Sequence, residues 1–360
     1  MYVCKSQAIA EGKVPGASYA VTSLDQELYY GEAGLKSFEN PSAGKINDKS
    51  LFWICSQTKL VVTLIEAGKV SYETPVAGII PELANPVVLD DVTSPTSGFK
   101  PARNTILVKH LLNHSSGLHY PPHGKVTPDD LNPAYTSIAY EAGFPSVPLA
   151  FEPGTSWMYG YSCDIIVFVA ERVTGKSIQE YCKEHIFGPL GLTRMTFHLT
   201  PGLKEDLVHL TYRRKDGKLE KWADQLVPHP NLVEVILGGI GLYSTLKDYL
   251  AYFGIFSRSK RGVATIEKFT GWNDVSFGVG LCLATADWPG RRKKGSGFWY
   301  GWAGTYYFID PAAGIAVTYG TQVVPTCDVE VERLWEALER ALYAGLDEGL
   351  RSINLEHMYK

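Results

Sequence analysis

Short apolar runs lie at both ends of the chain, and helical patterns lie between them. Residues 17–33 (ASYAVTSLDQELYYGEA) place two β-type runs around a polar Asp25-Gln26 turn, which predicts a hairpin. Further β-type runs are predicted at 277–284, 304–310 and 314–320. Helical patterns occur at 60–69, 106–113, 162–174, 177–187 and 328–343. A loop is predicted at 80–105, which is rich in Pro, Asn and Ser, and the polar, basic stretch 213–221 is predicted to be a surface excursion that turns at Asp216-Gly217.

This order of elements predicts an α+β fold, an α/β sandwich. Strands at both ends and helices in the middle indicate one antiparallel sheet built from both termini, flanked by helices, with a mostly helical region inserted. We expect a sheet domain from residues 1–55 and 235–360 and a helical domain from residues 56–234. The active-site cleft would lie between the two domains.

Composition narrows the class of protein. The 360 residues carry 34 Lys+Arg and 38 Asp+Glu, a net charge of −4, and 45% are hydrophobic. The charge is too balanced for a nucleic-acid binder that relies on a basic surface, and the apolar content is too high for a disordered chain. No apolar run approaches the ~20 residues that span a bilayer. The expected protein therefore has neither a nucleic-acid nor a membrane partner.

The cysteines and the N-terminal segment bear on the compartment. MYVCKSQAIAEGKVPG lacks the apolar stretch of a secretory signal, and none of the six cysteines forms a CxxC pair. We expect buried free thiols in a cytoplasmic protein, and no metal site, because no Cys/His cluster has ligand spacing. The basic run from Arg291 to Lys294 is expected to be a solvated hairpin tip. Its alternative role is to dock an acidic carrier protein or a coenzyme phosphate.

Five Ser-x-x-Lys pairs occur in the chain, and one stands apart. Ser56 and Lys59 follow the apolar run Leu51 to Cys55 and open a helical segment. Two side chains three residues apart share a helix face, where a desolvated lysine can take the proton of a serine nucleophile. The serine would lie at a buried helix N-terminus, which favours negative charge. On these grounds alone a catalytic pair and a plain N-cap serine both stay open.

Several motifs resemble those of one family. Ser56-Gln57-Thr58-Lys59 looks like the first motif of the serine β-lactamase and penicillin-recognising superfamily. Further segments resemble family stretches in the family's order: LLNHSSGL from Leu111, PGTSWMYG from Pro153, FGPLGL from Phe187, GGIGLYST from Gly238 and GWAGT from Gly301. The chain is most similar to the class C-like esterase branch, with its fungal lovastatin-type acyltransferases and family VIII carboxylesterases. The resemblance implies a β-lactamase/transpeptidase-like fold.

The resemblance also implies roles for single residues. Ser56 would be the nucleophile, Lys59 its proton acceptor, and Tyr159 a general base or acid paired with Lys59. The backbone N–H groups of Ser56 and Thr305 would form the oxyanion hole. Candidate substrate-binding residues lie in the second and third motifs: Trp157, Tyr161, Tyr300, Trp302, Ala303 and Gly304. No metal or organic cofactor is implied.

Three departures from the β-lactamase pattern bear on the substrate. Tyr161 stands where β-lactamases have an asparagine, and it is itself an alternative to Tyr159 as the base. Trp302 replaces a lysine suited to a substrate carboxylate with an aromatic wall. The segment from Lys59 to Lys69 is about five residues shorter than in the family, so the support of the site is in question.

These observations predict a serine-dependent acyl-transfer enzyme that cleaves an ester or thioester through an acyl-Ser56 intermediate. Its substrate would be a small acyl ester or thioester, and its acyl donor could be an acyl-carrier protein or coenzyme A. A β-lactamase or D,D-peptidase is the enzymatic alternative. A catalytically silent homologue that binds a ligand is the alternative of another class.

Overall fold

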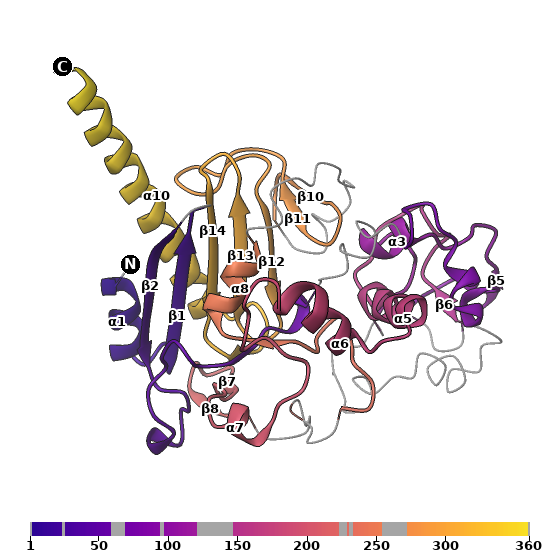
Figure 1. Cartoon of the computed structure of the whole chain (residues 1–360), viewed down its shortest axis with the longest axis horizontal. Helices are drawn as coiled ribbons and strands as arrows, with labels where there is room; N and C mark the ends of the chain where they lie inside the picture. The colour runs from indigo at the N-terminus through magenta and orange to yellow at the C-terminus, as the bar shows by residue number, and fades with distance from the viewer. Residues whose placement is uncertain are drawn as a thin grey trace.

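The largest sheet of the computed structural model has seven antiparallel strands (Figure 1). The structure describes residues 2–23, 26–58, 69–93, 97–120, 147–222, 229, 233–253 and 272–358. The strand order is β10-β11-β12-β13-β14-β1-β2. The strands are β1 (Gly16–Thr22), β2 (Glu27–Gly34), β10 (Val275–Phe277), β11 (Cys282–Ala284), β12 (Gly297–Gly301), β13 (Thr305–Asp310) and β14 (Ile315–Gly320).

The two ends of the chain meet inside this sheet. The N-terminal strand β1 pairs with β14, and Tyr19 lies opposite Tyr319. The predicted hairpin at 17–33 is confirmed as β1 and β2, and the prediction of one antiparallel sheet from both termini is confirmed with it.

Helices cover both faces of the sheet. On one face, Trp335 of α10 (Val329–Met358) packs on Tyr19, Tyr306 and Tyr319, with ring centroids 5.6–6.0 Å apart. On the other face, Tyr249 of α8 (Leu246–Tyr252) packs on Tyr307 at 6.0 Å. Every residue of β13 and β14 is therefore buried, which explains why these strands are mostly apolar and do not alternate with polar residues.

The remaining elements lie mostly between β2 and β10 in the chain. The helices are α1 (Tyr2–Ala10), α3 (Val108–Leu112), α5 (Ser162–Thr174), α6 (Ile178–Cys182) with the π-helical turn η6 (Lys183–Phe187), and α7 (Pro201–Lys204). Single 3-10 turns are η1 (Pro41–Ala43), η2 (Cys55–Gln57), η3 (Val76–Gly78) and η4 (Pro81–Leu83). Three small sheets are β3 (Phe52–Trp53) with β9 (Tyr243–Ser244); β4 (Val87–Leu89), β5 (Phe99–Pro101) and β6 (Pro148–Leu149); and β7 (Thr211–Arg213), β8 (Leu219–Lys221) and β15 (Val323–Val324). In Figure 1, α3, α5 and the β4-β5-β6 sheet lie at the far end from α1 and α10.

Some predicted elements were wrong. The run at 277–284 is not one strand but the hairpin of β10 and β11, because Gly280 turns the chain with φ +74°. The predicted loop at 80–105 contains β4 and β5. In contrast, the surface excursion predicted at 213–221 falls on the β7–β8 hairpin, and its turn includes Asp216 and Gly217 as predicted. The C-terminal helix continues well past 343, and its end extends beyond the body of the molecule (Figure 1). The helical pattern at 60–69 lies almost wholly outside the described residues.

The basic run from Arg291 to Lys294 was also predicted wrongly, as a solvated hairpin tip. Arg292 is 2% exposed, and its guanidinium bonds both carboxylate oxygens of the buried Glu339 on α10 at 2.7–2.9 Å. Arg291 bonds the same carboxylate at 2.7 and 2.9 Å. The run is therefore not a solvated tip: two of its four cations anchor α10, and only Lys293 and Lys294 are exposed. In the described part of the chain, no helix is both long and apolar enough to cross a membrane.

Candidate active site

Ser56 lies on a tight turn directly after β3. The turn is the 3-10 element η2, and Cys55 before the serine has φ +46°, a conformation that a residue with a Cβ rarely adopts. Cys55 and Gln57 are buried, whereas Ser56 is half-buried. A strained backbone of this kind costs about 1–3 kcal/mol and persists only where the surroundings hold it. Of the three residues in this turn, only Ser56 is therefore accessible.

Contacts from the Gly238–Thr245 stretch and α8 hold this turn. Leu242 N–H donates to Thr58 Oγ1 at 3.2 Å, and Leu242 accepts from Ile54 N–H at 3.1 Å. The Tyr249 hydroxyl donates to the carbonyl of Gln57 at 2.7 Å. Lys59, the predicted proton acceptor, lies outside the described residues.

The end of β12 closes over the same turn. A Cβ on Gly301 would lie 2.5 Å from the Ile54 carbonyl oxygen, so only glycine permits this approach. Thr305 at the start of β13 is paired with Gly301 and donates its hydroxyl to the same carbonyl at 3.4 Å. Between them, Gly304 has φ +66°. The predicted oxyanion residue Thr305 is therefore held beside the segment that leads into Ser56.

Gln322 joins these two segments, and the sequence did not point to it. Its Nε2 donates to the carbonyls of Trp53 at 3.1 Å and Ala303 at 3.2 Å, and its Oε1 accepts from Trp53 N–H at 3.1 Å. The side chain is fully buried. No local pattern identifies it, because its role depends on the end of β14 meeting β3. It fixes the strand before Ser56 against the turn before Thr305.

Tyr159 lies among aromatic rings over β12. Its ring centroid is 4.6 Å from that of His114, 5.3 Å from Trp299 and 5.7 Å from Tyr120. Trp299 Nε1 donates to the Tyr159 hydroxyl at 3.4 Å. Trp299 and Gly301 are two residues apart on β12 and so share one face, about 7 Å apart along the strand. The Ser56 turn and Tyr159 therefore contact neighbouring positions of the same strand.

The backbone next to Tyr159 packs closely against a neighbouring segment of the chain. A Cβ on Gly160 would lie 2.5 Å from both His119 Cα and the Leu118 carbonyl oxygen. Tyr161 is buried at the start of α5, and its ring is 4.6 Å from that of Tyr120. Asp164, one turn into α5, accepts from Gly239 N–H at 2.8 Å. The second-motif segment and the Gly238–Thr245 stretch are thus fixed to each other.

The other predicted substrate-binding residues divide into three groups. Trp302 is half-buried beside Trp53 and Trp222 at 5.8 and 5.5 Å, next to the buried Ala303 and Gly304. Trp157 is buried against His114 and Phe277. Tyr300 stacks on Tyr306, which in turn stacks on Trp335 of α10. The structure therefore brings Trp302 and Trp157 to the two ends of the site but directs Tyr300 toward α10.

The surroundings of Ser56 favour neutral groups. Burial raises the pKa of the Cys55 thiol, although the backbone of Ala303 and Trp302 hydrogen-bonds it. Burial also raises the pKa of Tyr243, which lies in β9 opposite Trp53. Burial lowers the pKa of His119. These groups remain uncharged near neutral pH, and the described residues hold no cluster of His, Cys, Asp and Glu fit for a metal ion.

The family model for beta-lactamases matches residues 5–341. The chain belongs to the beta-lactamase family. Within it, the chain is 26% identical over 395 residues to monacolin J acid methylbutanoyltransferase of Aspergillus terreus, covering 95% of each. It is 35% identical over 214 residues to lovastatin esterase of Penicillium rubens, covering 56% of this chain and 52% of that protein.

A solved structure shares the fold of this chain. Unliganded simvastatin synthase from Aspergillus terreus matches with a TM-score of 0.81 and 22% identity, over 96% of this chain and 97% of the other. The predicted β-lactamase/transpeptidase-like fold is confirmed. The named relatives are acyltransferases and an esterase, which is consistent with acyl transfer by this beta-lactamase family member.

Proposed function

We propose that this protein is a serine-dependent acyl-transfer enzyme that cleaves an ester or thioester through an acyl-Ser56 intermediate. The observation that carries the proposal is the placement of Ser56 on a strained, half-buried turn against Gly301, with Tyr159 over the same face of β12. The fold family supplies an additional argument, because its named relatives transfer or hydrolyse acyl groups.

In the proposed first half-reaction, Ser56 Oγ attacks the substrate carbonyl carbon. Its proton passes to Lys59, assisted by Tyr159, and the backbone N–H groups of Ser56 and Thr305 stabilise the oxyanion. The bond from the carbonyl carbon to the leaving oxygen or sulfur then breaks, and the proton is delivered to that atom. In the second half-reaction, water or an alcohol attacks the acyl-Ser56 ester and frees the serine.

We infer that the substrate is neutral at the position nearest Trp302. β-Lactamases carry a lysine there, and the half-buried indole beside Trp53 and Trp222 offers an aromatic wall instead. An acyl-carrier protein or coenzyme A is a candidate donor, although Arg291 and Arg292 are bound to Glu339 and do not offer it free charge. The cleft would lie between the sheet domain, which comprises residues 1–55 and 235–360, and the helical domain, which comprises residues 56–234.

The central test is labelling with a fluorophosphonate probe together with turnover of p-nitrophenyl butyrate. We expect both in the wild type and neither in Ser56→Ala. Ser42→Ala, which removes the exposed serine of another Ser-x-x-Lys pair, is the matched control and should keep both. Labelling that survives Ser56→Ala would contradict the mechanism, and a wild type without label or turnover would favour a silent binding protein.

Two further assays separate the finer alternatives. Added alcohols should give new esters, detected by mass spectrometry, if the enzyme transfers its acyl group and does not only hydrolyse it. Butyryl-coenzyme A and a butyryl-carrier protein, compared at equal concentration, test the donor. Nitrocefin turnover far above that of simple esters would favour the β-lactamase alternative and overturn the argument from Trp302.

A further inference from the structure

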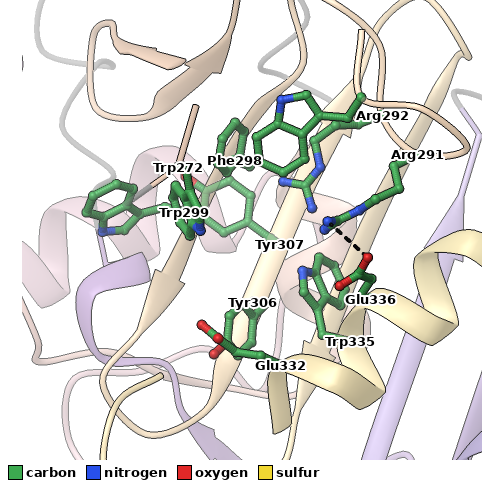
Figure 2. Close-up of a pocket in the computed structure, with 11 residues that line it drawn as sticks. Trp272, Arg291, Arg292, Phe298, Trp299, Tyr306, Tyr307, Glu332, Trp335 and Glu336 are labelled. Carbon is green, nitrogen blue, oxygen red and sulfur yellow. Dashed lines mark ion pairs between the residues drawn. The ribbon is translucent and has the colours of Figure 1, made fainter. Parts of the chain in front are cut away.

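A pocket lies beside α10, and it borders the candidate site through Trp299, whose Nε1 donates to the Tyr159 hydroxyl. Its volume is about 220 Å³. Figure 2 shows it between α10, β12, β13 and the segment around Arg291. Aromatic residues form most of the wall: Trp272, Trp288, Phe298, Trp299, Tyr306, Tyr307 and Trp335.

The faces of these rings already hold one cation. The guanidinium carbon of Arg292 lies 4.5 Å from the Phe298 ring centroid, 4.9 Å from Trp288 and 5.7 Å from Trp335. Aromatic faces carry a negative quadrupole that attracts cations and repels anions. The wall of this pocket is therefore chemically suited to positive charge.

The two arginines occupy one end of the pocket and are neutralised there. Glu339 pairs with both at 2.7 Å, and Glu336 pairs with Arg291 at 3.8 Å. Figure 2 shows Glu332 away from the arginines, below Tyr306. Among the described residues, no cation lies within ion-pair distance of Glu332, although the Cys327 thiol hydrogen-bonds it. Burial, with Asp328 and Glu336 nearby, raises the pKa of this carboxyl.

We propose that this pocket binds a small organic cation, an alkylated ammonium ion, with its charge against Glu332 and its alkyl groups against Trp272, Tyr306 and Trp335. A bound ammonium would supply the counter-charge that Glu332 lacks, beside aromatic rings whose electrostatics favour a cation over an anion. The volume equals that of roughly seven water molecules, which suits a cation of choline size. The proposal is independent of the acyl-transfer chemistry.

Isothermal titration calorimetry with three ligands of matched shape tests the charge requirement. Choline is the cation, 3,3-dimethylbutan-1-ol its neutral isostere and 3,3-dimethylbutanoate the anion. We expect choline to bind at least tenfold more tightly than the other two. Equal binding of choline and the alcohol would overturn the proposal in favour of a plain apolar pocket. Tighter binding of the anion, or no binding of choline, would overturn it as well.

Substitutions test the location. Glu332→Gln keeps the shape of the side chain and should weaken choline binding about tenfold, while binding of the neutral alcohol changes little. Glu330→Gln, two residues earlier on α10 and outside the pocket, is the matched control. Unchanged choline binding by Glu332→Gln would contradict the proposal. Trp272→Leu provides a second variant with the same expectation, and circular dichroism confirms that each variant is folded.

Discussion

At the scale of the residue, a single buried amide links the two halves of the candidate site. Gln322 hydrogen-bonds Trp53 on one side and Ala303 on the other, so it sets the position of Ser56 relative to Thr305. Oxyanion stabilisation depends on donors placed to within a few tenths of an ångström of the developing charge. In the proposed mechanism, Gln322 would therefore act as a positioning residue that affects the chemical step through this spacing.

Replacing Gln322 with leucine should lower kcat far more than it changes KM. We expect a fall in kcat of about 10- to 100-fold, because the Ser56 and Thr305 N–H groups lose their fixed spacing. Loss of the buried hydrogen bonds should also cost about 1–3 kcal/mol of stability. Steady-state kinetics with p-nitrophenyl butyrate and chemical denaturation measure the two effects.

Gln322→Glu separates positioning from simple loss of stability. The carboxylate still accepts from Trp53 N–H but no longer donates to the carbonyls of Trp53 and Ala303. We expect its kcat to lie between those of the wild type and Gln322→Leu. A leucine variant with reduced stability but unchanged kcat would show that the amide is only structural.

At the scale of the element, α10 is attached to the sheet by a buried ion pair. Burial alone would raise the pKa of Glu339, but Arg292 and Arg291 lower it to about 2, from an ordinary value of 4.5. The charged carboxylate therefore stabilises the folded state fully above pH 4.5. This contribution is lost as the pH falls from 4.5 toward 2.

Glu339→Gln should destabilise the protein by about 3–5 kcal/mol at neutral pH, because it leaves the buried Arg292 guanidinium without a carboxylate and removes the nearer partner of Arg291. Thermal unfolding of the variant should also depend less on pH between 4.5 and 2 than that of the wild type. Glu336→Gln is the control, since its partly exposed pairs contribute at most about 1 kcal/mol. Equal melting temperatures of the two variants would contradict the assigned role of Glu339.

Elements with local signals could be predicted from the sequence, and elements defined by distant partners could not. The helix predicted at 162–174 has the bounds of α5, because its apolar stripe and the left-handed Gly175 that ends it are both local features. The strand β12 was not predicted, since Gly-Phe-Trp-Tyr-Gly is buried on nearly all positions and shows no alternation. The short strands β4 and β5 exist only through pairing with each other and with β6.

The residues of the candidate site likewise include some that the sequence could predict and some that it could not. Motif resemblance pointed to Ser56, Tyr159 and Thr305, which the structure places along β12 and the start of β13. Gln322 and the Arg292–Glu339 pair were missed, because each joins segments far apart in the chain. Tyr300 was selected because it is close to Trp302 in the sequence, but on β12 it alternates with Trp299 and Gly301, so it points to the face opposite theirs.

At the scale of the whole molecule, the central pairing of β1 with β14 makes both ends of the chain part of one core. Removing residues 1–34 would delete β1 and β2 and expose an edge of β14 that is buried on both faces. We expect this truncated chain to aggregate, because a long apolar edge strand pairs with other chains. Size-exclusion chromatography of the soluble fraction measures the outcome, and a monomeric, cooperatively melting product would contradict it.

The same pairing has a consequence during synthesis on the ribosome. Tyr19 is synthesised 300 residues before its partner Tyr319. At typical elongation rates of about 5–20 residues per second, the β1–β2 hairpin waits on the order of 15–60 seconds without its neighbour. A nascent chain with an unpaired apolar strand for that long is a substrate for chaperones, so yield in a heterologous host should depend on chaperone supply and translation speed.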